Sequence, residues 1–306
     1  MHADIEAACK RIAGYVRTTP VMYLEAGDWG IDGHLVLKLE QLQHTGSFKP
    51  RGAFNRILSN RIPKAGVIAA SGGNHGVAVA YAAQQLGYPA EVFVPEVCPP
   101  VKVQRLRDYG AQVTLVGATY AESLEASQIR AARTGALVVH AYDQPEVVAG
   151  QGTLAYEFAQ QVPDLDTILV AVGGGGLIGG FAAWFEGNVR VIGVEPASAA
   201  SMAAALQTGE PVDFEVGGIA ADSLGARRAG TLAFSMVKQY VDRVILVEDE
   251  SIRTAQRTLW NDLRIVAEPG GATATAALIS GLYRPVPGER VGVVICGANT
   301  DPGQIV

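Results

Sequence analysis

A lysine in an unusual setting is the first residue of this chain whose type and neighbours suggest chemistry. The chain has six lysines and eighteen arginines, and only Lys49 stands among small hydroxyl and glycine residues, in TGSFKPRG (residues 45–52), just before an expected helix. A lysine held beside apolar and aromatic groups has a lowered pKa, and its free amine can form a Schiff base with a carbonyl compound. The alternative is a solvated surface lysine, because most lysines are exposed.

A second candidate site combines glycines with polar side chains after a short apolar run. Residues 71–76 read SGGNHG, and a helix is expected to begin near Asn74. The free N–H groups at such a helix start can bind an anion such as a carboxylate, and Ser71, Asn74 and His75 add side-chain donors. The alternative is a glycine-rich turn in which Ser or Asn caps the helix.

A third motif, GGGGL at residues 173–177, follows an expected strand. Four successive glycines that open a helix form a nest of N–H groups suited to a phosphate. The same residues also satisfy G-x-G-x-x-G, and Glu195 lies where an acid that binds a ribose belongs, so dinucleotide binding is a rival interpretation. A tight packing turn is the third possibility, although glycines in succession are entropically costly.

Two shorter motifs are uninformative alone. Glu268, in AEPGGA (residues 267–272), could serve a site or simply cap a helix. Cys296, in CGAN (residues 296–299), could face a ligand or be a buried small hydrophobic residue, as most free cysteines are.

Composition excludes several classes of protein. The chain has 306 residues and a net charge of −6, which argues against the basic surface of a nucleic-acid-binding protein. Hydrophobic residues make up 49% and charged residues 18%, which excludes a disordered chain. Three cysteines, odd in number and far apart in sequence, argue against a disulfide framework and favour the cytoplasm. Neither a signal peptide nor a membrane-spanning segment is expected.

Other catalytic chemistries lack their motifs. The five histidines show no paired ligand spacing, so no zinc site is expected. No serine has a glycine two residues before and after it, which excludes the nucleophile elbow of the hydrolases. No Walker A lysine follows the glycines of residues 173–176.

The elements that must position these motifs alternate along the chain. Expected strands are residues 67–70, 90–94, 112–116, 136–140, 167–172, 189–194, 244–247 and 291–296. Expected helices are residues 74–86, 101–109, 120–134, 177–186 and 249–263. Alternating strands and helices predict an α/β protein with parallel sheets. In such sheets ligands bind outside the carboxyl ends of the strands, which is where the glycine-rich turns fall.

Taken together, the motifs TGSFKPRG, SGGNHG, VGGGGL, AEPGGA and CGAN, in this order, resemble the fold type II pyridoxal-phosphate enzymes. Within that group the chain is most similar to the serine/threonine dehydratases (threonine ammonia-lyases) and serine racemases. The resemblance extends from RTTP at residues 17–20 to the C-terminus. It implies pyridoxal 5'-phosphate as the cofactor, in place of a dinucleotide at residues 173–177.

The resemblance also implies a role for each motif. Lys49 would hold the cofactor as a Schiff base and then remove the substrate α-proton, with Phe48 packed beside the cofactor. Asn74 would hydrogen-bond the ring phenol oxygen, Cys296 would face the pyridine nitrogen as a neutral partner, and Glu268 would lie in the cofactor site. The cofactor phosphate would be bound by Gly173, Gly174, Gly175, Gly176 and Leu177. The substrate would contact Ser71, Gly72, Asn74, His75 and Tyr142.

The implied reaction is α,β-elimination of water from a β-hydroxy amino acid, L-threonine or L-serine, to give a 2-oxo acid and ammonia. Three alternatives stay open. The substrate could be another β-hydroxy amino acid, of the phenylserine or 3-hydroxyaspartate type. The enzyme could perform β-replacement, or the chain could be a silent paralogue that only binds a ligand.

Departures from the family pattern change some expectations. Gly72 stands where the racemase has a proton-donating serine, so we expect negligible racemisation. Glu195 matches one ligand of the family's divalent metal, but Ser201 stands where the second carboxylate belongs, so no metal is expected. The family's A-D-G reads ADS here, with Ser223 in place of glycine, which indicates an altered pocket.

The family fold predicts two three-layer α/β domains like those of tryptophan synthase β, with the cofactor in the cleft between them. Residues 1–54 and 144–306 would form the large domain, and residues 55–143 a small domain inserted into it. Closure of the small domain would exclude water. A homodimer is expected, with an amino acid as substrate and no nucleic-acid or membrane partner.

Overall fold

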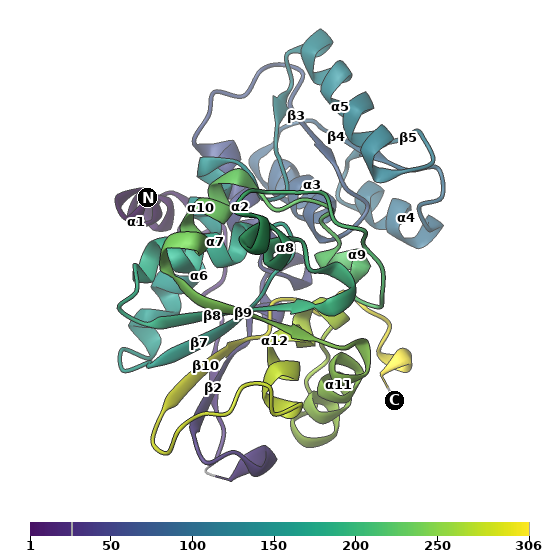
Figure 1. Ribbon diagram of the computed structural model, residues 1–306. Helices are drawn as coiled ribbons and strands as arrows, with labels where there is room; N and C mark the ends of the chain where they lie inside the picture. The colour runs from purple at the N-terminus through teal and green to yellow at the C-terminus, as the bar shows by residue number, and fades with distance from the viewer. Residues whose placement is uncertain (26, 306) are drawn as a thin grey trace.

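The computed structural model describes residues 1–25 and 27–305, which form two β-sheets with helices packed on them (Figure 1). The larger sheet has the strand order β1-β2-β10-β7-β8-β9. Its strands are β1 (Val21–Tyr23), β2 (His34–Lys38), β7 (Thr167–Ala171), β8 (Arg190–Pro196), β9 (Val241–Val247) and β10 (Arg290–Val294). Every neighbouring pair is parallel except β1 with β2. The α/β class with parallel sheets is therefore confirmed.

Two groups of helices accompany the larger sheet, and the helices within each group pack on one another. The first group is α1 (His2–Ile12), α6 (Pro145–Gln161), α7 (Gly176–Phe185) and α10 (Thr231–Tyr240). The second group is α11 (Asp249–Leu263) and α12 (Pro269–Ile279), of which α12 contacts β7, β8, β9 and β10. Two short helices, α8 (Ser201–Thr208) and α9 (Ala221–Leu224), lie in the connection between β8 and α10.

The smaller sheet has the order β5-β4-β3-β6, and its pairs are parallel. Its strands are β3 (Val67–Ala70), β4 (Ala90–Val94), β5 (Gln112–Leu115) and β6 (Leu137–Val138). Its helices are α3 (Asn74–Leu86), α4 (Pro100–Asp108) and α5 (Tyr120–Thr134). Helix α2 (Lys49–Leu58) leads from the larger sheet into it and packs on both α3 and α6. The domain boundaries at residues 54/55 and 143/144 stay a prediction.

Apolar residues fill both faces of the smaller sheet, as a buried parallel sheet requires. Side chains alternate along β3, so Val67 and Ala69 pack on the side of α3, while Ile68 and Ala70 pack with Ala131 of α5. This explains why the four residues of β3 form an uninterrupted apolar run.

Local signals account for the helix whose bounds match the expected range of residues 120–134. Thr119 accepts a hydrogen bond from the Glu122 N–H, and the Glu122 side chain in turn accepts one from the Thr119 N–H, which is a capping box. Gly135 ends the helix with a left-handed φ of +73°, a conformation that glycine adopts without steric cost.

The strand expected over residues 136–140 is shorter than predicted. Pairing continues to Val139, whose N–H donates to Ile68 O, but the chain then turns. The turn forms because His140 Nδ1 accepts hydrogen bonds from the N–H groups of Tyr142 and Asp143. It directs residues 141–143 toward the larger sheet.

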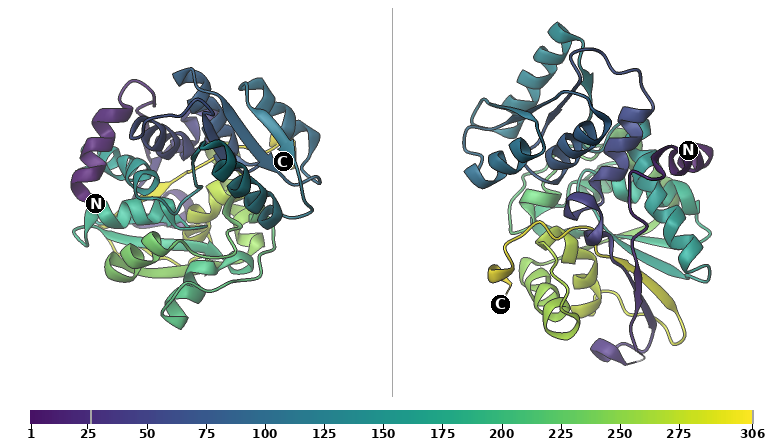
Figure 2. Two further views of the ribbon diagram at one scale, coloured as in Figure 1. Left: turned by 90° about the horizontal axis from the view of Figure 1, so that it is seen from above. Right: turned by 180° about the vertical axis from the view of Figure 1, so that it is seen from behind.

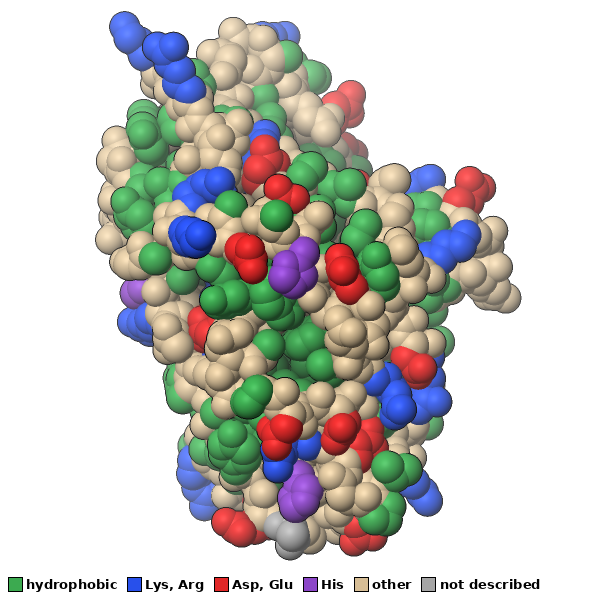
Figure 3. Space-filling model, turned by 90° about the vertical axis from the view of Figure 1, so that its left-hand side faces the viewer, with side chains coloured by type: hydrophobic (Ala, Val, Ile, Leu, Met, Phe, Trp, Pro, Cys, Tyr) green, Lys and Arg blue, Asp and Glu red, His purple; other side chains and the backbone are tan. Residues whose placement is uncertain are grey.

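The two sheets stand one above the other, and the C-terminal residues end on the side of the molecule opposite α1 (Figures 1 and 2). On the face drawn in Figure 3, basic and acidic side chains are scattered among one another and are not gathered by sign. Within residues 1–25 and 27–305, no helix is both long and apolar enough to cross a membrane.

Candidate active site

A pocket at the carboxyl ends of β7 and β10 brings together three of the five sequence motifs. Its lining residues are Phe48, Lys49, Tyr142, Ala171, Gly173, Gly174, Gly175, Gly176, Leu177, Ser223, Leu224 and Cys296. The lysine, the four glycines and the cysteine, separated by more than 100 residues in sequence, therefore share one cavity. Ser223, in the segment where the family pattern has glycine, also lines it, although the sequence analysis assigned it no contact.

Lys49 is the first residue of α2, and its side chain is partly buried in this pocket. Its Nζ donates a hydrogen bond of 2.9 Å to Ala141 O and lies 5.0 Å from the centre of the Phe48 ring. Burial lowers the pKa of Lys49 to about 8, and Cys296 and Glu268 oppose that shift. A lysine with this pKa has a substantial fraction of free amine near neutral pH, which is what nucleophilic attack on an aldehyde requires.

The glycine loop between β7 and α7 has no room for side chains. A Cβ on Gly174 would lie 2.3–2.5 Å from three atoms of the Tyr142 ring, and a Cβ on Gly175 would lie 2.6 Å from the Ala233 Cβ. Gly175 also has a φ of +94°. Among the described residues, none accepts a hydrogen bond from the N–H of Gly173, Gly174 or Gly175, and no side chain caps α7. These free N–H groups at a helix start fit a phosphate.

A hydrogen-bond chain links the smaller sheet to α12. Asn74, the first residue of α3, donates from Nδ2 to Glu268 Oε1 over 2.6 Å. Asn299 Nδ2 donates to Asn74 Oδ1 over 2.5 Å and to Thr45 O over 2.9 Å, which fixes the orientation of the Asn74 amide. The contacts of Asn299 were not predicted, although the residue lies in the CGAN motif.

Glu268 and Cys296 are two buried acids near Lys49. Glu268 is 4% exposed, and burial raises its pKa to about 7. Cys296 is 3% exposed, and its Sγ contacts Gly270 O at 3.5 Å. Burial, with a further contribution from Glu268, raises the pKa of the Cys296 thiol far above its usual range. The thiol is therefore neutral.

No residue of the SGGNHG turn lines the pocket, and Asn74 joins the turn to Glu268. Ser71 Oγ accepts a hydrogen bond from the Gly73 N–H, and neither Ser71 nor Gly72 lines the pocket. A Cβ on Gly72 would lie 2.8 Å from Cys98 Sγ. His75 is buried, with Nε2 2.8 Å from Val139 O, and burial lowers its pKa to about 3. The imidazole is thus neutral and engaged with Val139, so its ring does not face the pocket as a free donor.

Tyr142 covers the glycine loop. The same Cβ test places its ring against Gly174 and its backbone against Gly176, and its hydroxyl donates to Arg228 O. Burial raises the pKa of Tyr142 to about 12. The Tyr142 side chain therefore lies at the end of the pocket that the glycine loop forms.

Glu195 and Ser201 lie apart from this pocket, at the end of β8 and the start of α8. Glu195 is fully buried, and its two carboxylate oxygens each accept a 2.8 Å hydrogen bond, from the N–H groups of Met202 and Ala203. Across the part of the chain that the structure describes, no three His, Cys, Asp or Glu side chains form a group that could hold a metal ion. Glu195 and the Ser201 hydroxyl are a poor donor set for a divalent cation, which takes several oxygen ligands.

The fold and the pocket define a class of enzyme in which a lysine and a glycine-rich phosphate loop hold a cofactor at the carboxyl edge of a parallel sheet. A family profile described as pyridoxal-phosphate dependent enzyme matches residues 12–297, and the chain belongs to this family. The L-threonine ammonia-lyase of Thermotoga maritima is 39% identical over 99% of this chain and 76% of the relative. The phenylserine dehydratase of Ralstonia pickettii is 39% identical over 95% of this chain and 90% of the relative.

A solved structure of maize serine racemase superposes with a TM-score of 0.93 at 34% identity, covering 99% of this chain and 95% of that one. The cofactor of the chain is pyridoxal phosphate, which confirms the sequence prediction and removes the dinucleotide interpretation of residues 173–177. The chain is a lyase with the dehydratase function of these relatives.

Proposed function

We propose that this enzyme removes water from L-threonine or L-serine and releases a 2-oxo acid and ammonia. One observation carries the proposal: Lys49 shares a pocket with the free N–H groups of the glycine loop, and burial lowers the pKa of Lys49 to about 8. The threonine ammonia-lyases among the relatives give the substrate class.

The pocket residues and the Asn74 amide could together hold the cofactor. The N–H groups of Gly173, Gly174, Gly175, Gly176 and Leu177 would bind its phosphate, with the Tyr142 ring packed over the loop. Phe48 would contact its ring face, and Cys296 would meet its pyridine nitrogen. The Asn74 amide, held by Asn299 and Glu268, would donate to its phenol oxygen. When bound, pyridoxal phosphate supplies an aldehyde that condenses with amines and a ring that withdraws electrons from the substrate Cα.

Lys49 would move the proton on which the reaction depends. Its Nζ, when not bonded to the cofactor, would be an amine with a pKa near the working pH, as a general base requires. It would accept the α-proton and, as an ammonium group, return a proton to the departing β-hydroxyl, so that water leaves. The released enamine then hydrolyses to the 2-oxo acid and ammonia.

The neutral groups beside Lys49 suit elimination. The neutral Cys296 thiol would leave the pyridine nitrogen of a bound cofactor without the charged partner that an aspartate would provide. That favours prompt loss of a β-hydroxyl. At the other side, the N–H groups at the start of α3, with Ser71, Gly72, Asn74 and the backbone of His75, would bind the substrate carboxylate.

Phenylserine is a second candidate substrate. The observation that favours it is the relative from Ralstonia pickettii, whose length this chain covers to 90%, with an identity equal to that of the threonine ammonia-lyase.

The test is 2-oxo acid release by the purified, cofactor-loaded protein from L-serine, L-threonine, their D-forms, phenylserine and 3-hydroxyaspartate. Turnover of L-threonine or L-serine at least about tenfold faster than any other substrate supports the proposal, because one pocket contact changes selectivity by that much. Faster turnover of phenylserine or 3-hydroxyaspartate moves the substrate and keeps the mechanism. No release from any of the six, together with product formation when a thiol is added, replaces the proposal with β-replacement.

We further propose a cytoplasmic homodimer that needs no divalent ion. The resemblance to the family supports the dimer, and the cysteine content supports a reducing compartment. Ser201, in the place of a second carboxylate near Glu195, supports independence from a metal. Light scattering on the purified protein, and activity in excess chelator, test the assembly and the metal.

A further inference from the structure

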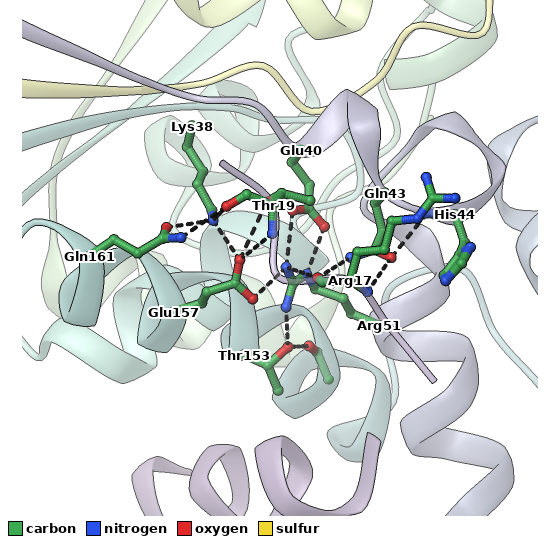
Figure 4. A network of polar contacts seen from close by, with 11 residues as sticks. Arg17, Thr19, Lys38, Glu40, Gln43, His44, Arg51, Thr153, Glu157 and Gln161 are labelled. Atoms are coloured by element: carbon green, nitrogen blue, oxygen red, sulfur yellow. Dashed lines mark hydrogen bonds and ion pairs between the residues drawn. The ribbon is translucent and has the colours of Figure 1, made fainter. Parts of the chain in front are cut away.

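Four charged side chains are buried together beneath the first turn of α2 (Figure 4). Lys38 at the end of β2, Glu40 and Arg51 are at most 1% exposed, and Glu157 of α6 is 14% exposed at its side chain. Lys38 Nζ donates to Glu157 Oε1 over 2.5 Å, to Thr19 O and to the Gln161 side chain. The proposed mechanism uses none of these groups.

Arg51 is the centre of this cluster. Its Nε donates to Glu40 Oε1 over 2.6 Å and its Nη2 to Glu40 Oε2 over 3.0 Å, a two-bond fork on one carboxylate. Nη2 also donates to Glu157 Oε2 over 2.9 Å, and Nη1 to Thr153 Oγ1 over 3.3 Å. The guanidinium therefore ties the first turn of α2 to α6 and to the segment that follows β2.

Stability alone does not explain the cluster. Desolvation of two cations and two anions offsets most of their mutual attraction, so buried ion pairs are often no more stabilising than apolar residues of the same shape. A planar guanidinium on a carboxylate does fix distance and direction, however. What the cluster supplies is a defined position for the first turn of α2, which carries Arg51.

That turn also carries Lys49. Residues two apart on a helix point about 200° apart around its axis, so Arg51 leaves α2 on the side opposite Lys49. Glycines bring α2 and α6 into backbone contact at the same level, since a Cβ on Gly150 would lie 2.6 Å from Arg51 O and 2.7 Å from the Gly52 Cα. The fork and this contact together hold one side of α2 while Lys49 extends from the other.

We propose that Arg51, held by Glu40 and Glu157, is a positioning residue that sets the place of the Lys49 amine in the active site. The inference rests on the proposed function of Lys49. It predicts that loss of the fork impairs proton transfer at Lys49 more than it impairs substrate binding.

The test compares holoenzyme variants in three measurements: kcat and KM, the circular dichroism of the bound cofactor's visible band, and Tm. Arg51→Lys keeps the charge and removes the fork, and Glu40→Gln keeps the shape and removes the charge that the fork binds. The matched control is Glu289→Gln, because Glu289 is also a buried carboxylate, bonded to Thr167 and Tyr283, but at the amino ends of β10 and β7, away from the pocket at their carboxyl ends. Its loss should lower Tm without reaching Lys49.

We expect Arg51→Lys and Glu40→Gln to lower kcat by about tenfold to a hundredfold, the effect of a displacement of about 1 Å, with KM changed by less than about twofold. The dichroism band should change with kcat, while Glu289→Gln keeps the kcat and the band of the wild type. Wild-type kcat and dichroism in Arg51→Lys or in Glu40→Gln would overturn the inference. It would also be overturned if Glu289→Gln, at the same Tm, lost as much kcat and dichroism as these two variants. If Arg51→Lys does not fold, Glu40→Gln alone decides by the same criteria. A wild-type protein without a cofactor band or turnover would contradict the proposed function itself.

Discussion

Two buried acids beside Lys49 are held toward their neutral forms, and this is the main electrostatic feature of the site. Burial raises the pKa of Glu268 to about 7 and that of the Cys296 thiol well above its usual range. Burial also lowers the pKa of Lys49, which makes the free amine available. The site thus disfavours charge on all three groups: near neutral pH the Cys296 thiol is neutral, and the pKa values of Lys49 and Glu268 place each between its two protonation states.

Glu268 gives the cofactor-free protein a pH-dependent stability. Its pKa is raised from 4.5 to about 7, so between these values the folded state binds more protons than the unfolded state, and stability falls as pH rises. The contribution is on the order of 3 kcal/mol, at 1.36 kcal/mol per pKa unit. We therefore expect Glu268→Gln to stabilise the cofactor-free protein against urea more at pH 8 than at pH 5. An equal effect at both pH values would show that Glu268 is ionised throughout.

We propose that Gly72 prevents racemisation of the substrate. A proton must be delivered to the face of the substrate opposite Lys49 for racemisation, and Gly72 has no proton to give. We expect chiral chromatography of recovered L-serine to show racemisation at least about a thousandfold slower than elimination, as expected for loss of a positioned general acid. Recovery of D-serine at a rate near that of 2-oxo acid release would contradict this.

At the scale of elements, helix starts do most of the proposed binding. The uncapped start of α7 presents the N–H groups of the glycine loop, and α3 and α12 begin at the ends of the Asn74–Glu268 hydrogen bond. Helix α2 differs, because its first turn carries the Lys49 side chain on one side and the Arg51 side chain, bonded to Glu40, on the opposite side. The glycine loop is the element whose geometry is tested most simply.

Gly174→Ala should weaken cofactor binding. The new Cβ would meet the Tyr142 ring at 2.3–2.5 Å, so the ring or the loop must move. The N–H groups of the loop would then no longer point toward one common position. We expect at least about a tenfold higher Kd for pyridoxal phosphate in fluorescence titrations, the effect of one or two impaired hydrogen bonds to a charged group. Gly217→Ala is the control, because nothing lies within 4 Å of its Cβ. Equal affinity in the two variants would remove the loop from the cofactor site.

At the scale of the whole molecule, elements with clear signals in their own sequence were predictable, and elements that depend on tertiary contacts were not. The helices over residues 120–134 and 249–263 have the predicted bounds, because a capping box and Gly135 delimit the first and apolar periodicity marks the second. Strand β1 and the helix over residues 145–161 were not assigned. Strand β1 has three residues and pairs antiparallel to β2, and α6 is apolar on most sides because other helices surround it.

The candidate site shows the same limit. Lys49, the glycine loop and Cys296 were predicted from their motifs, and they do line one pocket. The engagement of His75 with Val139, the place of Tyr142 over Gly174 and the role of Asn299 depend on contacts between distant segments, which no local pattern records. Arg51 lay in the first motif, but its burial depends on Glu40 and on α6.

The most direct test of the central claim compares 2-oxo acid and ammonia release from L-threonine and L-serine by the cofactor-loaded wild type and by Lys49→Ala. We predict equimolar 2-oxo acid and ammonia from the wild type. We predict no visible band of lysine-bound cofactor and at least about a thousandfold lower release from the variant, as expected when one group is both nucleophile and base. Lys49→Ala with release within tenfold of the wild type would contradict the account, because the proton would then move without Lys49.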